Sequence, residues 1–303
     1  MEHVIILGDG IAGLSAAIYA ARAQLNPVVI TGYESGGQLM WTTDVENYPG
    51  FPEGVLGPDL IERMRKQAER FGTRFIFKRC ESVRGTELAW ECDLGDEKLA
   101  ARSIIVATGA TARTLGLEAE KSYMGKGIST CATCDGAFTK GKNVLVVGGG
   151  DSAMEESTFL AKFAEHVTIV HRKDTFRASK IMQERALKNP KISVEWNSEV
   201  VDVTGDGAKV TGARLRDTVT GDERSVETDF VFYAIGHIPN TSFLGELVTT
   251  DEQHKTIITN ERYMTSAPGV FACGDVQDPI WRQAVTAAGT GAAAAISVER
   301  YLA

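Results

Sequence analysis

Long apolar runs, an excess of basic residues and a dense set of cysteines are all missing from this chain of 303 residues. Lys and Arg number 32 against 40 Asp and Glu, so the net charge is −8 and the isoelectric point lies near 5.3. Because the phosphates of a nucleic acid would be repelled, this balance argues against a nucleic-acid partner.

The sequence also shows no pattern typical of a targeting segment or a membrane span. The apolar N-terminus lacks the basic start of a signal peptide and carries Glu2 instead. Residues 284–298 include no charged side chain, but this segment is short and built mostly from Ala, Gly and Thr, which is too weakly apolar for a membrane span. We therefore expect a buried helix there, no membrane partner and a cytoplasmic protein.

The five cysteines are too few and too scattered for the disulfide framework of a small secreted domain. Cys80 and Cys92 lie in alternating, strand-like segments, and we expect them to be buried free thiols.

Cys131 and Cys134 differ from these cysteines because CxxC spacing lets two sulfur atoms bond. Zinc would need two further ligands, and neither a second CxxC nor a nearby His pair exists, so no metal site is predicted. Two structural thiols remain an alternative to the favoured redox disulfide, and the adjacent Asp135 is either an acid/base or a helix cap.

Glycine-rich turns occur twice, each after an apolar strand and before a helix of small residues. The two turns are Gly8-Asp9-Gly10-Ile11-Ala12-Gly13 and Gly148-Gly149-Gly150-Asp151-Ser152-Ala153. In a dinucleotide-binding fold such glycines allow a tight turn and close backbone approach, and the N–H groups of the helix end bind a pyrophosphate. An ordinary strand-to-helix turn is the alternative for each copy.

The order of predicted elements also repeats. In the first cycle we expect strands at 4–7, 27–31, within 75–92 and at 103–109, with helices at 15–23 and 57–71. In the second we expect strands at 143–147, 167–170, within 192–216 and at 230–236, with a helix at 152–164. A strand at 269–275 and a helix at 283–302 follow. The duplication predicts an α/β protein with two Rossmann-like domains, each with three layers (ββα). One domain would comprise residues 1–113 and 244–303, and residues 114–243 would be inserted in it.

The two copies differ where their second strand ends, which is where ribose selectivity is decided. The second copy carries His171, Arg172, Lys173 and Arg177 there, and such side chains would bind the 2′-phosphate of NADPH. A solvated basic turn is the alternative. The first copy lacks this cluster, which is consistent with FAD. Asp9 is unexpected beside a pyrophosphate because like charges repel, and it would have to point into solvent or bond the backbone.

These segments together resemble the low-molecular-weight thioredoxin reductases, flavoenzymes of the pyridine nucleotide-disulfide oxidoreductase family, over essentially the whole chain. Besides the two turns and Cys131-Ala132-Thr133-Cys134-Asp135, the resemblance rests on Ser35-Gly36-Gly37-Gln38-Leu39, Val45-Glu46-Asn47-Tyr48-Pro49-Gly50, Ala107-Thr108-Gly109-Ala110, Gly274-Asp275-Val276 and Arg282-Gln283-Ala284. Asp9 and Ile11 depart from the family's small residue and proline, and Lys173 stands where a second arginine is common.

The resemblance implies an NADPH-dependent flavoprotein that reduces the disulfide of thioredoxin or a thioredoxin-like protein, and a homodimer. Electrons would pass from NADPH to FAD and then to the Cys131/Cys134 disulfide, with Cys134 facing the flavin, Cys131 attacking the substrate and Asp135 acting as acid/base. FAD would be bound by Gly8, Asp9, Gly10, Ile11, Ala12, Gly13, Gln38, Asn47, Val83, Gly109, Asp275, Arg282, Gln283 and Ala284. NADPH would be bound by Gly148, Gly150, Asp151, Ser152, His171, Arg172, Lys173 and Arg177.

Four other functions remain as alternatives. A flavin-dependent dithiol oxidase would share the CxxC, but such relatives tend to lose the basic cluster. A ferredoxin– or flavodoxin–NADP reductase would lack the CxxC. The remaining two are a reductase of another thioredoxin-like partner and a flavoprotein that senses redox state without turnover.

Overall fold

The computed structural model describes residues 1–42 and 44–303 and divides into two compact units. The first unit comprises residues 1–111 and 238–303, and the second comprises residues 112–237. The chain passes between them at β9 (Ala110–Ala112) and β18 (His237–Pro239), which pair with each other. The sequence placed the second passage at 243/244. Asn240 instead falls in the first unit, where its N–H donates to Gly109 O at 3.0 Å. Leu244 lies in the core of the first unit, the domain to which the sequence assigned it.

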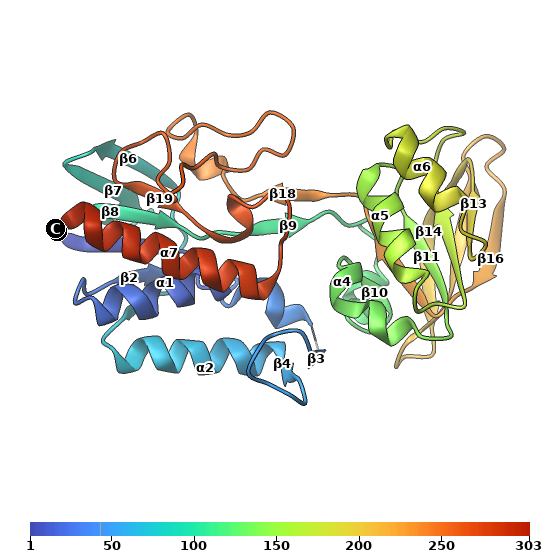
Figure 1. Cartoon of the computed structure of the whole chain (residues 1–303), viewed down its shortest axis with the longest axis horizontal. Coiled ribbons are helices and arrows are strands. Elements are labelled where there is room, and N and C mark those ends of the chain that lie inside the picture. The colour runs from blue at the N-terminus through green and yellow to red at the C-terminus, as the bar shows by residue number, and fades with distance from the viewer. Residues whose placement is uncertain (43) are drawn as a thin grey trace. The chain divides into compact units, whose positions relative to one another are not determined.

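A parallel sheet forms the centre of the first unit (Figure 1). Its strands, in spatial order, are β5 (Arg74–Ile76), β2 (Val28–Ile30), β1 (Glu2–Leu7), β8 (Lys98–Val106) and β19 (Val270–Ala272). The antiparallel strands β6 (Ser82–Thr86) and β7 (Ala89–Asp93) continue from β8. The helices are α1 (Ile11–Arg22), α2 (Gly57–Arg70) and α7 (Ala284–Leu302). Because β19 pairs with β8, the C-terminal tail completes the first sheet.

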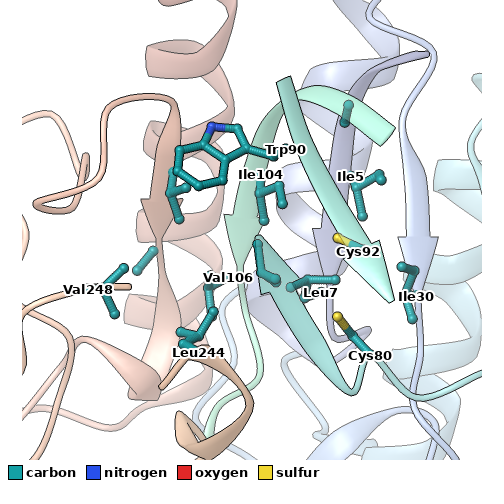
Figure 2. Close-up of a cluster of buried hydrophobic side chains, with 14 of the residues drawn as sticks. Ile5, Leu7, Ile30, Cys80, Trp90, Cys92, Ile104, Val106, Leu244 and Val248 are labelled. Atoms are coloured by element: carbon teal, nitrogen blue, oxygen red, sulfur yellow. The ribbon is translucent and has the colours of Figure 1, made fainter. Parts of the chain in front are cut away.

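Both faces of β1 are buried, which explains why this strand is apolar at successive positions rather than alternately. Ile5 and Leu7 pack in one cluster with Trp90, Cys92 and residues from the C-terminal half of the chain, such as Leu244 (Figure 2). Val4 and Ile6 face the other way, into a cluster with the small residues of α1 and α7. The sheet is therefore covered by helices on one face and by β6, β7 and loops on the other.

The second unit repeats this arrangement. Its parallel sheet has the order β10 (Ile128–Ser129), β17 (Phe230–Tyr233), β11 (Asn143–Val147), β12 (His166–Val170) and β13 (Ile192–Glu195). An antiparallel sheet of β14 (Ser198–Gly205), β15 (Val210–Asp217) and β16 (Glu223–Glu227) covers one face, and α5 (Asp151–Leu160) and α6 (Lys180–Leu187) cover the other. Strand β10 comes before the other strands of this sheet in the sequence. It pairs with β17 at the sheet edge, the position that β19 holds beside β8 in the first unit.

Shorter elements complete the fold. They are η1 (Gly37–Trp41), β3 (Asp44–Val45), β4 (Val55–Leu56), α3 (Glu120–Tyr123), α4 (Ala132–Asp135), η2 (Gly136–Thr139), η3 (Ser242–Leu244) and η4 (Gly274–Val276). Among the described residues, no helix is long and apolar enough to cross a membrane.

The predicted α/β class and the positions of the main strands and helices are confirmed. Several boundaries differ from the prediction, and α6 was not predicted; the strand expected at 103–109, for example, is β8 at Lys98–Val106. Two helix ends differ by four residues. Helix α1 begins at Ile11 rather than residue 15, because Gly10 is its N-cap. Helix α5 ends at Leu160 rather than residue 164, because residues 161–163 form a turn there.

Candidate active site

The first glycine turn connects β1 to α1 and has the shape that a bound pyrophosphate requires. Gly8 has φ +103°, and a Cβ on it would collide with the carbonyl oxygen of Ala107. A Cβ on Gly13 would collide with the Gly8 oxygen, so α1 packs directly on the turn. A Cβ on Gly10, by contrast, would meet no described atom nearer than the Gly36 oxygen at 4.0 Å. The space beside Gly10 and the uncapped end of α1 fit a phosphate group.

The second glycine turn, between β11 and α5, has the same division of roles. A Cβ on Gly148 would lie 2.6 Å from the Ala234 oxygen and 2.8 Å from the Cβ of Ala153, which is itself fully buried. A Cβ on Gly150 would meet no described atom within 4 Å. Gly150 is the N-cap of α5, and no side chain caps that helix end. This turn therefore also fits a phosphate group.

The basic cluster is held against the second turn through the backbone. Gly149 O accepts hydrogen bonds from Arg177 N at 2.8 Å and Ala178 N at 3.2 Å. Arg172, Lys173 and Arg177 are exposed, so their charges are available to a ligand. His171 is placed differently from these three. Its buried ring lies under Gly149, and its Nε2 is 3.0 Å from Thr175 O.

Asp151 and Ser152 open helix α5 on the surface of the second unit. The Asp151 carboxylate accepts a hydrogen bond of 2.7 Å from the Ser179 N–H at the start of α6. Asp151 thus joins the starts of the two helices beside the second glycine turn.

In the first unit, several predicted residues from distant segments are joined by hydrogen bonds. The Gln38 side-chain amide donates to Ala110 O, and Asn47 Nδ2 donates to Gln283 Oε1 at 3.4 Å. Gln283 is the N-cap of α7 and forms a capping box with Thr286. Ile11 and Ala12 are buried at the start of α1, and Gly109 has φ +67° with open space beside it. The side chain of Val83 lies in the hydrophobic core.

The loop before α7 is organised by Asp278, a residue that the sequence interpretation missed. Its buried carboxylate accepts hydrogen bonds from the N–H groups of Ile280, Trp281 and Arg282 at 2.8, 2.9 and 3.1 Å. Arg282 adopts φ +48°, an unusual conformation for a residue with a side chain. Asp278 therefore places the backbone of Arg282, Gln283 and Ala284 at the start of the helix.

Asp275 lies in η4 next to the first turn, because Gly274 packs on Ala12 with no room for a Cβ. Burial, and secondarily the nearby Asp278 carboxylate, raise the pKa of Asp275 to about 6. At neutral pH the folded protein therefore holds a carboxylate in an unfavourable environment.

Replacing Asp275 by Asn should stabilise the ligand-free protein at pH 8 by about 2 kcal/mol, because Asn carries no charge to bury. Since the folded pKa exceeds that of the unfolded chain, the wild type binds more protons when folded between about pH 4 and 6. Its stability therefore falls as pH rises through that window and is level above it. Urea unfolding at pH 4 and pH 8 measures this, and a difference between variant and wild type that is the same at both values would contradict the assignment.

The predicted disulfide is present in the second unit. Cys131 and Cys134 are bonded across α4, with their Cα atoms 5.3 Å apart. Cys134 is exposed, and Cys131 is partly buried. The Cys134 N–H donates to Cys131 Sγ at 3.2 Å, so the helical turn holds both ends of the CxxC.

Asp135 ends α4 and lies next to this disulfide. Burial raises the pKa of Asp135 above the ordinary value, and a hydrogen bond from the Ser129 side chain acts in the opposite direction. Ser129 Oγ also accepts a hydrogen bond of 3.1 Å from the Cys131 N–H. Asp135 therefore keeps its proton to a higher pH than an exposed carboxyl, as a proton donor beside a thiol needs. Ser129 was not predicted from the sequence.

The three remaining cysteines are buried free thiols, as predicted for Cys80 and Cys92. Burial raises the pKa of Cys273 to about 12. Only the CxxC pair therefore has the exposure that thiol chemistry requires. Among residues 1–42 and 44–303, no group of three or more His, Cys, Asp or Glu side chains is placed to hold a metal ion.

Asp9 does not point into solvent. Only 2% of its side chain is exposed, and its Oδ1 accepts a hydrogen bond of 2.9 Å from the Gly36 N–H. Its Oδ2 accepts from the Ser35 hydroxyl at 2.6 Å and forms an ion pair with Arg65. Of the two placements considered for Asp9, the backbone bond is confirmed. Arg65 was missed because it lies 56 residues away, in no recognisable motif.

The fold and the site together define a class of protein, one with two dinucleotide-binding folds, the second of which carries a CxxC disulfide. A family model described as pyridine nucleotide-disulphide oxidoreductase matches residues 2–291. The chain belongs to this family.

Individual relatives are similar over the full chain. A protein named thioredoxin reductase from Mycolicibacterium smegmatis is 51% identical over 303 residues, which cover 100% of this chain and 97% of that one. A protein named NADPH-dependent thioredoxin reductase 3 from Arabidopsis thaliana is 50% identical, covering 100% of this chain but 58% of that one. Among solved structures, thioredoxin reductase from Streptococcus pyogenes MGAS5005 has a TM-score of 0.95 at 40% identity, covering 99% of this chain and 97% of that one.

Proposed function

We propose that this chain is a flavoenzyme that uses NADPH to reduce the disulfide of thioredoxin. The observation that carries the proposal is the exposed Cys131–Cys134 disulfide in a chain with two glycine turns, each of which leaves room for a phosphate group. Full-length similarity to proteins named thioredoxin reductase supports the choice of substrate.

In this proposal FAD binds to the first unit and NADPH to the second. FAD, when bound, supplies the two-electron chemistry that links a hydride donor to a disulfide. Gly10 and the start of α1 would hold its pyrophosphate, and Gln38, Asn47, Asp275 and the segment 282–284 would bind other parts of the cofactor. Hydrogen bonds hold Gln38 to Ala110 O, Asn47 to Gln283 and the Arg282 N–H to Asp278, which fixes these residues before the ligand binds.

NADPH selectivity is assigned to three exposed cations beside the second turn, Arg172, Lys173 and Arg177. Guanidinium groups form charge-assisted hydrogen bonds with a phosphate, so they favour a coenzyme with a 2′-phosphate. His171 contributes by supporting the turn from below, because its ring fills the space under Gly149.

Reduction of thioredoxin proceeds by thiol–disulfide exchange once the CxxC pair is a dithiol. The Cys131 thiolate attacks one sulfur of the thioredoxin disulfide and the other leaves as a thiolate, which forms a mixed disulfide. The Cys134 thiolate then attacks Cys131 Sγ, which regenerates the Cys131–Cys134 disulfide and releases thioredoxin as a dithiol after two protons are taken up. Asp135 donates a proton to a departing thiolate, since its buried carboxyl has a raised pKa.

Asp135→Asn should lower the rate of thioredoxin reduction by about 100-fold, because the variant lacks a proton donor beside the thiols. The wild-type rate should fall as pH rises through the raised pKa of Asp135, and the variant should lack that decline. Stopped-flow measurement across pH tests both expectations. Asp222→Asn, an exposed carboxylate on the turn between β15 and β16, is the matched control. A pH profile that is unchanged in Asp135→Asn would remove this role.

The proposal as a whole is tested by mixing the purified protein with NADPH and then with oxidised thioredoxin. A yellow protein that bleaches with NADPH and recovers its colour with thioredoxin is the expected result. Recovery only with oxygen would instead indicate an NADPH oxidase. Bleaching by a small dithiol but not by NADPH would indicate a dithiol oxidase, and the lack of any bleaching would overturn the proposal.

Two broader proposals rest on the family resemblance. A homodimer is proposed, and sedimentation equilibrium of the purified protein tests it. A cytoplasmic location is proposed because an NADPH-driven dithiol system operates in a reducing compartment. Cell fractionation tests the location.

A further inference from the structure

The ion pair between Asp9 and Arg65 joins three segments of the first unit that are separated in sequence. Asp9 lies in the glycine turn, Ser35 follows β2, and Arg65 lies on α2. The Ser35 hydroxyl donates to Asp9 and accepts from Arg65, so it bridges the pair. Exposed fractions of 2% for the Asp9 side chain and 13% for Arg65 show that the ion pair is largely enclosed, and Ser35 is partly buried beside it.

The network also fixes how segment 35–37 lies across the glycine turn. The Gly36 N–H donates to Asp9 Oδ1 at 2.9 Å, and Gly36 adopts φ +93°. A Cβ on Gly37 would lie 3.4 Å from the Gly10 Cα, so this segment approaches Gly10 closely. Gly10 is the residue that leaves space for a phosphate group. Asp9 therefore holds one side of that space in place through the backbone of Gly36.

Arg65 is held on its other side by aromatic rings. Its guanidinium carbon lies 4.6 Å from the centre of the Phe75 ring and 5.3 Å from that of Phe77. Cation–π contacts with two rings keep the guanidinium at the carboxylate rather than free in solvent. The positive charge therefore stays next to Asp9, which lies one residue before the N-cap of α1.

We propose that Asp9 and Arg65 are positioning residues for the FAD pyrophosphate: Asp9 fastens segment 35–37 over the turn, and Arg65 cancels the charge that Asp9 brings there. This inference rests on the proposed binding of FAD to the first unit. Without Arg65, an uncompensated carboxylate would lie beside a doubly negative pyrophosphate in a poorly solvated place, and the two would repel. Arg65 is thus needed only because Asp9 is charged.

Four variants test this dependence: Arg65→Met, Asp9→Asn, the double variant, and Arg70→Met as a control. Arg70 lies on the same helix and stacks on Phe71, so its replacement removes a similar contact elsewhere. Asn at position 9 still accepts the Gly36 hydrogen bond but carries no charge. The readout is the dissociation constant of FAD for FAD-stripped protein, followed through the fluorescence of free FAD.

Arg65→Met should weaken FAD binding by at least about 30-fold, and the double variant should recover to within about tenfold of the wild type. Asp9→Asn alone and Arg70→Met should each change the constant by less than about tenfold. A purely structural role for Arg65 predicts no recovery in the double variant, because its packing on Phe75 is lost in both. Failure of the double variant to bind better than Arg65→Met would overturn the inference. If Arg65→Met does not fold, the double variant is compared with Asp9→Asn. A dissociation constant for FAD that is more than about tenfold higher in the double variant would then overturn the inference.

The same variants separate this inference from the proposed function. If the wild type binds no FAD, the proposed function fails. Thermal unfolding of the FAD-free variants then still decides whether the two side chains are coupled, since a coupled pair gives non-additive losses of stability. If the wild type binds FAD and all four variants bind it equally, only the inference fails.

Discussion

Cys134→Ser is expected to abolish thioredoxin reduction, lowering its rate by at least about a thousandfold. A serine hydroxyl forms no bond with Cys131 Sγ, so the chain loses the disulfide that accepts two electrons and the thiolate that resolves the mixed disulfide. The variant should still bind FAD and bleach with NADPH, because position 134 lies outside both glycine turns. Steady-state NADPH oxidation with thioredoxin, beside the absorbance of the flavin, measures the two properties separately.

Cys80→Ser is the matched control for this loss. Cys80 Sγ lies 3.3 Å from Ser82 O and donates a hydrogen bond to it, and a serine hydroxyl makes the same bond. This variant should reduce thioredoxin at the wild-type rate. If Cys134→Ser reduces thioredoxin at an undiminished rate, the proposed electron path is wrong. An equal loss of rate in both variants would indicate a general disturbance of folding.

Removing Arg172 and Arg177 together is expected to cause the second large effect. With both changed to Ala, kcat/KM for NADPH should fall by about 100-fold or more, since each charge-assisted hydrogen bond to a phosphate contributes about 1.5–3 kcal/mol. The value for NADH should change little, because NADH has no 2′-phosphate. Steady-state kinetics with the two coenzymes gives this ratio directly.

An arginine outside the cluster supplies the control here. Arg185 is exposed in the last turn of α6, and Arg185→Ala should leave both coenzymes unaffected. Equal losses for NADPH and NADH in the double variant would show that the arginines support the fold or a shared part of the coenzyme. In that case the selectivity would have to reside elsewhere.

The two glycine turns could be predicted because their requirements are local. Gly8 needs a positive φ, Gly13 needs to approach the Gly8 carbonyl, and Gly10 needs space beside it, and all three lie within six residues. The apolar strands before the turns and the small residues after them are equally local. The CxxC pair belongs to the same category, because three residues of separation bring the sulfurs together on one helical turn. Sequence patterns report such features well.

The partners of the site residues lie too far along the chain to be predicted in the same way. Asp9 meets Arg65 and Ser35 only when α2 and the segment after β2 pack beside the turn. Asn47 meets Gln283 across 236 residues. His171, predicted as part of a phosphate-binding cluster, is buried under Gly149, whereas its neighbour Arg172 is exposed. Nothing in the local pattern separates these two positions.

For this protein, the amino-acid sequence by itself determined the α/β class, the internal duplication, the positions of the two nucleotide turns and the redox pair. Each of these depends on the intrinsic conformation or the spacing of neighbouring residues. Only the tertiary structure decided that β10 and β19 take equivalent sheet edges, that Asp278 orders the start of α7, and that the charge of Asp9 is neutralised by Arg65. These depend on which surfaces pack together, because ion pairs and hydrogen bonds between distant segments form only once the hydrophobic cores have brought the segments into contact.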